Sequence, residues 1–266
     1  MKLIEVQVEH FRNFINSSPV TIDPKITCLV GKNESGKTAF LHALNRLLPV
    51  RTNVSFSIPD QYPAWLEKRD RLQGIDLGLL KPIQAKFVLE PGEIDIIDAS
   101  YGKGVLVSNE VVLSKDYNGT LFHTVQISEN VTIKHILSDA DLPTKLKSEA
   151  GTLQSLQEFY DFIQRAQSRE NVSEEAKKVL EQIQKSQLDN ILKKGLSEVI
   201  WEKLKDLVPQ FLYFDKYSTL PYSVDITKLL NTPDNQLDDN ELTARSLLRL
   251  AAADKDYLTN PDYERS

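Results

Sequence analysis

The feature that most constrains this chain is a glycine-rich stretch at residues 31–38, GKNESGKT. It satisfies the pattern Gly-x-x-x-x-Gly-Lys-Ser/Thr, which carries meaning only where a strand precedes it and a helix follows. The apolar run ITCLV (residues 26–30) comes directly before it, and Phe40, Leu44 and Leu47 follow at helical spacing. The sequence therefore predicts an α/β fold organised around a strand–loop–helix unit.

The residue types in this stretch fit the binding of a polyphosphate. A phosphate chain that accepts hydrogen bonds from several backbone N–H groups must approach the main chain closely, and glycine has no Cβ to obstruct it. The following helix adds unpaired N–H groups and the positive end of its dipole. Lys37 is expected to reach the β- and γ-phosphates, and the Thr38 hydroxyl is expected to ligate Mg²⁺.

Composition narrows the class of protein. The chain has 266 residues, a net charge of −6 and a single Cys, which argues against a disulfide framework and against a surface coated in basic residues. The start of the sequence lacks the apolar core of a signal peptide, and no run is apolar for long enough to cross a bilayer. A cytoplasmic protein without membrane contact is expected. The cluster Lys68, Arg69 and Arg71 is interpreted as a solvated face, with nucleic-acid contact as the alternative.

Apolar periodicity predicts strands and helices along the chain. Strands are expected at residues 2–9, 19–22, 26–30, 83–90, 104–113, 120–127, 210–214 and 223–226. The run 26–30 has no polar alternation, as in a central strand buried on both faces, so Cys28 is expected to be buried. Asn118-Gly119 indicates an antiparallel hairpin, and Asp239 is expected to cap a last helix. Residues 50–82 are predicted to be irregular.

These elements predict three parts. Residues 1–150 form a lobe with the glycine-rich loop and an antiparallel hairpin annex, 151–208 form a helical insertion, and 209–266 hold a return strand and a helix. The predicted fold class is α/β, with a mixed central sheet, an antiparallel β annex and a helical insertion.

Three stretches resemble the ATPase heads of the SMC, RecF and OLD (overcoming lysogenization defect) type, and most closely those of OLD-type bacterial ATPases. They are HFRNF (residues 10–14), VGKNESGKTAFLHAL (30–44) and LVPQFLYFDKYSTLPYSVDI (207–226). The resemblance covers most of the chain, and the glycine-rich loop is its sharpest part. It implies an ABC-like P-loop ATPase head that binds ATP and Mg²⁺, of which this chain is the N-terminal portion.

The loop pattern and the resemblance together imply a set of residues that contact the nucleotide, with Thr38 also binding the metal ion. They are Arg12, Asn13, Gly31, Asn33, Glu34, Ser35, Gly36, Lys37, Thr38 and Ala39. The resemblance further implies a homodimer through the head, with DNA and an effector nuclease domain or subunit as further partners. In such heads ATP docks two copies together in DNA repair or antiphage defence, and hydrolysis releases them.

The catalytic carboxylates of such an ATPase are not identified in the sequence. Asp215 ends the apolar run FLYF, but Lys216 follows where a hydrolytic head has Glu. Gln61 and Gln84 are weak candidates for the glutamine that senses Mg²⁺ and water, and the signature segment of these heads is absent. A non-hydrolysing nucleotide sensor or scaffold is therefore the alternative, and a small P-loop phosphotransferase is a third. A GTPase is disfavoured because no Asn-Lys-x-Asp motif is present.

Overall fold

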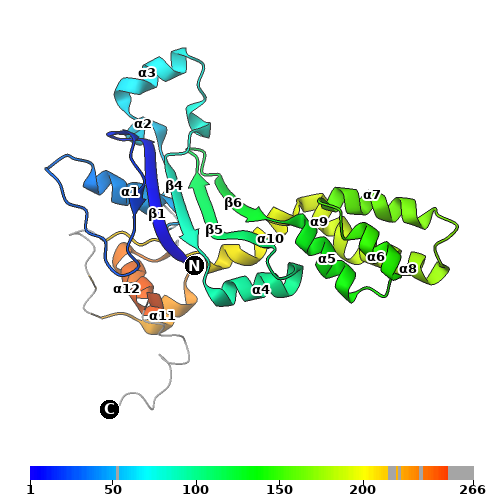
Figure 1. Cartoon of the computed structure of the whole chain (residues 1–266). Helices are drawn as coiled ribbons and strands as arrows, with labels where there is room; N and C mark the ends of the chain where they lie inside the picture. Colours follow the sequence, from blue (N-terminus) through cyan, green and yellow to red (C-terminus); the bar gives the residue numbers. More distant parts are fainter. Residues whose placement is uncertain (52–53, 215–219, 221–222, 234–235, 251–266) are drawn as a thin grey trace, which may run out of the picture.

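The computed structural model describes residues 1–51, 54–214, 220, 223–233 and 236–250. A twisted sheet forms its centre, with strand order β2-β1-β4-β5-β6 and with β3 also paired to β1 (Figure 1). The strands are β1 (Lys2–Phe11), β2 (Phe14–Asn16), β3 (Val20–Thr21), β4 (Ile83–Val88), β5 (Leu106–Lys115) and β6 (Leu121–Ile127). Every pairing between these strands is antiparallel.

One face of the sheet carries the core. Val6 in β1, Phe87 in β4 and Leu113 in β5 are completely buried, whereas their sequence neighbours point to the other face. That second face is polar: Lys86 in β4 pairs with Glu5 in β1 at 3.3 Å. The alternation therefore predicts both the strands and the face that helices cover.

The predicted hairpin is confirmed as β5 and β6. Residues 116–120 connect the two strands, so the turn is longer than a two-residue turn at Asn118-Gly119. The backbone N–H of Asp116 donates to the Thr120 carbonyl at 3.1 Å, and Gly119 has a φ of +88°. Glycine at this position allows the chain to reverse without strain.

Helices cover the core face of the sheet and extend beyond it. Their bounds are α1 (Lys37–Leu47), α2 (Ile58–Gln61), α3 (Ala64–Leu72), η1 (Leu77–Leu79), α4 (Pro91–Tyr101), α5 (Glu129–Asp139), α6 (Thr144–Ala150), α7 (Leu156–Gln167), α8 (Glu174–Ile183), the π-helical η2 (Gln184–Leu188), α9 (Asp189–Lys194), α10 (Leu196–Leu204), η3 (Lys205–Leu207), α11 (Ile226–Asn231) and α12 (Asp239–Leu250). Helix α1 contacts β1 and β4. None of the described helices has the length and apolar character needed to span a membrane.

Helices α5 to α9 form an arm that projects from the sheet beyond β6, and α10 runs back to it (Figure 1). Helix α7 begins at a capping box, in which Ser155 Oγ accepts the backbone N–H of Glu158 at 3.1 Å. At the base of the arm, the rings of His123 in β6 and Trp201 in α10 stack with centroids 4.8 Å apart. The predicted helical character of residues 151–207 is confirmed.

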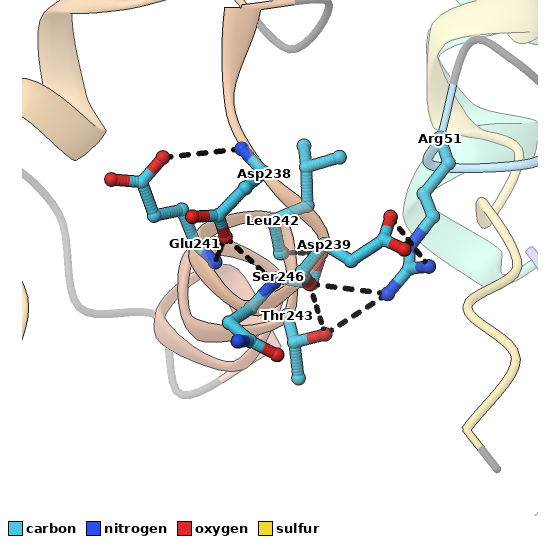
Figure 2. A network of polar contacts seen from close by, with 8 residues as sticks. Arg51, Asp238, Asp239, Glu241, Leu242, Thr243 and Ser246 are labelled. Atoms are coloured by element: carbon cyan, nitrogen blue, oxygen red, sulfur yellow. Dashed lines mark hydrogen bonds and ion pairs between the residues drawn. The ribbon is translucent and has the colours of Figure 1, made fainter. Parts of the chain in front are cut away.

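Helix α12 packs against α11 and is tied by one arginine, Arg51, to the segment that follows α1. Arg51 Nη1 donates to Asp239 Oδ1 at 3.1 Å, and its Nη2 donates to Thr243 Oγ1 at 3.0 Å (Figure 2). The cap of α12 is Asp238 rather than the predicted Asp239, because Asp238 Oδ1 accepts the backbone N–H groups of Asn240 and Glu241. The expected strand at 223–226 is wrong, since Ile226 begins α11.

The predicted buried strand at residues 26–30 is also wrong. This run belongs to no strand, Ile26 is 77% exposed, Val30 is 91% exposed, and Cys28 is exposed rather than buried. Asp23 Oδ1 accepts the N–H groups of Lys25 and Ile26, so local side-chain bonds replace a ladder. A strand buried on both faces needs neighbours on both edges, and the described residues supply none to this run.

The mixed central sheet is consequently not formed within the described residues. The one parallel pairing there is an isolated bridge between Pro49 and Phe211, which lies in the predicted strand at 210–214. The region 50–82 is also more regular than predicted, because it contains α2, α3 and η1. Helix α3 ends in Arg69 and Arg71, which bond to Asp70 and Glu67, as expected for a solvated face.

Candidate phosphate-binding site

The glycine-rich loop passes directly into α1, as predicted. Gly36 lies at the start of the helix with a φ of +96°, and Glu34 also adopts a left-handed backbone, at +64°. A Cβ at Gly36 would lie 2.8 Å from Phe14 Cζ and 2.9 Å from Asn13 Nδ2. Glycine is therefore required here for two reasons, its dihedral angles and the close approach of the β1–β2 turn.

The backbone amides of the loop have almost no internal partners. Between Gly31 and Ala39, among the described residues, only the N–H of Ser35 donates a hydrogen bond, to the Lys32 carbonyl at 3.3 Å. The amides at the start of α1 are unpaired for the usual reason that a first helical turn has no preceding carbonyl. A run of free, neighbouring N–H groups at a helix N-terminus is an anion-binding arrangement.

The Lys37 side chain folds back over the loop. Its Nζ donates to the carbonyls of Gly31 at 2.9 Å and Lys32 at 2.6 Å, and lies 3.4 Å from Ser35 Oγ. The ammonium group is thus held at the loop and not in solvent away from it. A phosphate bound to the amides would have this positive charge beside it.

Asn13 and Phe14 support the loop from the turn between β1 and β2. Asn13 Nδ2 donates to the Glu34 carbonyl at 3.3 Å, and the Phe14 ring contacts the Phe40 ring edge-on with centroids 6.5 Å apart. The structure therefore brings together two stretches that lie apart in the sequence, FRNF and the glycine-rich loop.

Arg12 occupies the same turn but faces another neighbour. Its φ is +52°, its backbone N–H donates to the Gln61 carbonyl at 2.5 Å, and its guanidinium lies 5.7 Å from the centre of the Phe11 ring. Within the described residues no hydrogen bond joins the Arg12 side chain to the loop. Arg46 in α1 lies on the same ring, 5.9 Å from its centre.

The other residues predicted to contact the nucleotide differ in the exposure of their side chains. Asn33, Ser35 and Thr38 are not buried, so each can meet a ligand, whereas Ala39 is buried and contributes only its backbone. The Thr38 hydroxyl could ligate a cation bound to phosphate oxygens. No group of three or more potential metal-ligating side chains occurs in the described part of the chain, so a cation here would depend on the ligand for most of its coordination.

The two candidate glutamines lie in structural positions. Gln61 is buried, and its Oε1 accepts the backbone N–H of Ser57 at 3.1 Å. Gln84 is exposed in β4, opposite Gln7 on the polar face of the sheet. Asp215 lies outside the described residues.

A buried polar pair fixes the segment that Arg12 contacts. Tyr62 OH donates to Asp70 Oδ2 at 2.5 Å, and the Tyr62 ring stacks near His10, with centroids 6.1 Å apart. Hydrogen bonds from Tyr62 and Arg69 lower the pKa of Asp70, whereas burial raises the pKa of Tyr62. The proton therefore stays on the tyrosine, and the contact is a rigid support for the turn.

Arg46, which the sequence analysis did not single out, is half-buried in the last turn of α1. Burial, and then the positive charge of Arg12, lower the pKa of this arginine. A signal was available, because Thr38, His42 and Arg46 follow one another at intervals of four on a single helix face. The spacing places a cation on the same face of α1 as the candidate magnesium ligand.

Comparison with known proteins agrees with this geometry. Residues 1–117 match the family model of the AAA ATPase domain, which is less than half of the chain. No curated protein matches the chain. The matched part contains the loop, α1, the β1–β2 turn and strands β1 to β5. The similarity supports a P-loop ATPase fold and nucleotide binding, which in such domains typically involves Mg²⁺.

Proposed function

We propose that this chain is the ATP-binding lobe of an ATPase of the SMC, RecF and OLD type, and most closely of the OLD type. ATP docks two such heads together, and this switch serves DNA repair, DNA maintenance or antiphage defence. The observation that carries the nucleotide-binding part is the set of free backbone amides between Gly31 and Ala39, with Lys37 held beside them. The matched ATPase domain and the FRNF stretch support the family part.

The residues of the chain would divide the binding between them. Loop amides donate to the β-phosphate, Lys37 exchanges its carbonyl partners for phosphate oxygens, and Asn13 keeps the loop in place through Glu34. The Thr38 hydroxyl would hold Mg²⁺, which neutralises charge on the phosphates when bound. These contacts need no rearrangement of α1, because its first turn already presents its N–H groups.

The exposed apolar run at residues 26–30 supports the proposal that this lobe pairs with strands from further polypeptide. Ile26 and Val30 expose apolar side chains directly before the loop, where an ATPase head has its central strand. Pairing with strands from further residues or from a partner would bury this run. A homodimer through the head, DNA and an attached nuclease are part of the same proposal.

A non-hydrolysing sensor or scaffold is the second candidate function. It is favoured by Lys216, which follows Asp215 where a water-orienting Glu is expected. Such a module would bind Mg-ATP through the same loop but would not turn it over.

Calorimetry with Mg-ATP tests nucleotide binding by the glycine-rich loop, which both candidate functions require. Lys37→Ala should weaken binding by roughly 10- to 100-fold, because a hydrogen bond to a charged group is lost. Lys25→Ala is a matched control, since it removes an exposed lysine that precedes the loop. Equal affinity in the Lys37 variant, with unchanged melting temperature, would contradict nucleotide binding by this loop. Release of phosphate by the wild type would then separate an ATPase from a binding module.

A further inference from the structure

Two adjoining cavities lie at the base of the arm, the first of them where α4, α5, α9 and α10 meet (Figure 1). The first has a volume of about 280 Å³ and the second a volume of about 260 Å³, and Ile136, Asp139 and Ser186 line both. Together they offer the space that a small ligand needs. The glycine-rich loop contributes no residue to either cavity, so they are separate from the phosphate-binding site.

One face of α5 forms a wall of the first cavity. Its lining residues are spaced as on a single helix face: Thr132, His135, Ile136 and Asp139. Thr132 is 1% exposed, and its Oγ1 has no hydrogen-bond partner in the described part of the chain. A helical threonine can bond to a carbonyl of the preceding turn, and a buried hydroxyl without any partner is costly. A polar group on a bound molecule would satisfy it.

Further polar groups on the walls of the first cavity also lack partners. Among the described residues, no hydrogen bond involves the His135 ring, the Asn190 amide or the Tyr101 hydroxyl. Ser186 belongs to the π-helical η2, a backbone form that often occurs at functional sites. Ile191 adds buried apolar surface. A few unpaired polar groups beside apolar side chains are the usual lining of a ligand site.

The charge on the walls is negative. Asp139 lines both cavities and Asp141 lines the second, whereas no Lys or Arg of the described residues lines either. Asp139 Oδ1 accepts only a neutral hydroxyl, that of Ser138 at 3.0 Å, and neither carboxylate forms an ion pair with a described residue. Lys203 Nζ donates to Ser100 Oγ in the wall at 2.9 Å, but one cation does not balance two carboxylates. The cavities therefore favour cations over anions such as nucleotides.

We propose that these two cavities bind a linear aliphatic polyamine. Its ammonium groups would lie against Asp139 and Asp141, and their remaining N–H donors would bond to the oxygens of Thr132 and Asn190. The methylene groups between them would pack on Ile136, which lines both cavities. A metal ion fits less well, because the described residues contain no group of three or more potential metal-ligating side chains. The site does not depend on the proposed function.

Spermidine, added without nucleotide, tests the proposal by calorimetry and by its effect on the melting temperature. A salt concentration of about 0.15 M screens long-range attraction between the amine and exposed carboxylates. Asp139→Asn and Asp141→Asn each remove a charge at nearly constant shape and should weaken binding by roughly 10-fold or more. Asp95→Asn is the matched control, since this exposed carboxylate of α4 lines neither cavity.

Thr132→Val separates a role in binding from a role in the fold. The substitution replaces an unpaired hydroxyl by a methyl group of similar size, so the melting temperature of the free protein should stay the same or rise. Spermidine affinity should nevertheless fall by about 5-fold or more, because an acceptor of the ammonium group is lost. A lower melting temperature with full spermidine affinity would show that the hydroxyl serves the fold, and would contradict the proposed contact.

Saturable binding that weakens in Asp139→Asn and Thr132→Val but persists in Asp95→Asn supports the polyamine site. The inference is wrong if the wild type binds no spermidine, or if Asp139→Asn keeps full affinity. An equal loss in Asp95→Asn also overturns it, since amines would then be attracted only by the net charge of −6. Lys37→Ala should bind spermidine like the wild type, so a failure of ATP binding would leave this result unaffected.

Discussion

At the scale of single residues, the loop depends on a contact that its own sequence does not reveal. Gly36 is held against Asn13 and Phe14, so the turn between β1 and β2 fixes where α1 begins. The loop pattern explains why glycine suits a phosphate, but it says nothing of this second constraint. Gly36 therefore serves the fold as well as the ligand.

Gly36→Ala should be destabilising and should weaken nucleotide binding. A left-handed backbone costs an L-residue roughly 1–2 kcal/mol, and the clash with Phe14 and Asn13 adds about 1–3 kcal/mol of overpacking. Gly74→Ala is the matched control, because Gly74 has a φ of +74° and a Cβ added there would meet no atom within 4 Å. Urea unfolding measures both variants. Equal losses of stability would show that the contact with the β1–β2 turn contributes nothing.

The identities of the loop residues could be predicted from sequence, but their partners could not. Lys37 and Thr38 follow from spacing alone, since the pattern is local. The contacts of Asn13 with Glu34 and of Arg46 with the Phe11 ring join residues from different segments. A single sequence holds no record of which distant residues meet, so Arg46 was found only once the fold placed it on that ring.

At the scale of elements, the arm is fixed to the sheet by the packing of α10 against β6. His123 stacks on Trp201, and its Nε2 lies 3.6 Å from Glu198 Oε2. Burial lowers the pKa of His123 below its ordinary value of 6.5, and the Glu198 carboxylate opposes this shift only in part. The neutral imidazole is thus favoured in the folded protein.

Stability should therefore fall as the solution becomes acidic. Because the unfolded state takes up the proton of His123 more readily, this contribution is fully present above pH 6.5 and is lost as the pH falls from there toward the folded-state pKa. His123→Phe, which retains an aromatic ring against Trp201, should reduce the loss between about pH 8 and about pH 5. Denaturant unfolding at both values measures it.

A substitution of Glu198, the carboxylate beside His123, tests the same pH dependence of stability. Glu198→Gln removes the group that raises the pKa of His123, so the pH dependence should become steeper than in the wild type. A shallower dependence in Glu198→Gln would contradict this account of the β6–α10 contact.

Strand prediction succeeded for β1 and β4, where polar and apolar residues alternate, a local signal of one covered face. Strands β5 and β6 contain apolar runs and were predicted from their position on either side of Asn118-Gly119. The alternating run 223–226 did not form a strand, because Ile226 begins α11. A continuous apolar run such as residues 26–30 forms a strand only where other strands pair with both of its edges. Whether neighbours exist is a property of the rest of the molecule, so the pattern predicted a strand that the described residues do not complete.

At the scale of the whole molecule, α12 is joined to the loop-bearing helix through Arg51. This residue lies just after α1 and reaches a helix 188 positions later in the chain (Figure 2). The neighbouring bridge between Pro49 and Phe211 forms at the same end of α1. A few polar contacts and one backbone bridge therefore join the end of α1 to α12 and to Phe211.

Arg51→Ala should loosen α12 while leaving the sheet intact. Three hydrogen bonds to Asp239 and Thr243 are lost, so amide protons of α12 should exchange roughly 10- to 100-fold faster, with little change in β1 or β4. Hydrogen exchange followed by mass spectrometry resolves these segments. Arg71→Ala, which removes an arginine of α3, should leave α12 unchanged. Equal protection of α12 in the Arg51 variant would show that it is held by its apolar contacts alone.

The contact of Lys37 with two loop carbonyls has a thermodynamic consequence for any ligand. An incoming phosphate does not meet a loose chain that it must order; it competes with Gly31 and Lys32 for an ammonium group already in use. Binding then exchanges one set of hydrogen-bond partners of Lys37 for another. The entropic penalty is modest, and the measured binding enthalpy includes the cost of breaking the two bonds to the loop carbonyls. The same exchange slows the association of a ligand, because Lys37 must break its hydrogen bonds to the Gly31 and Lys32 carbonyls before it can bind a phosphate.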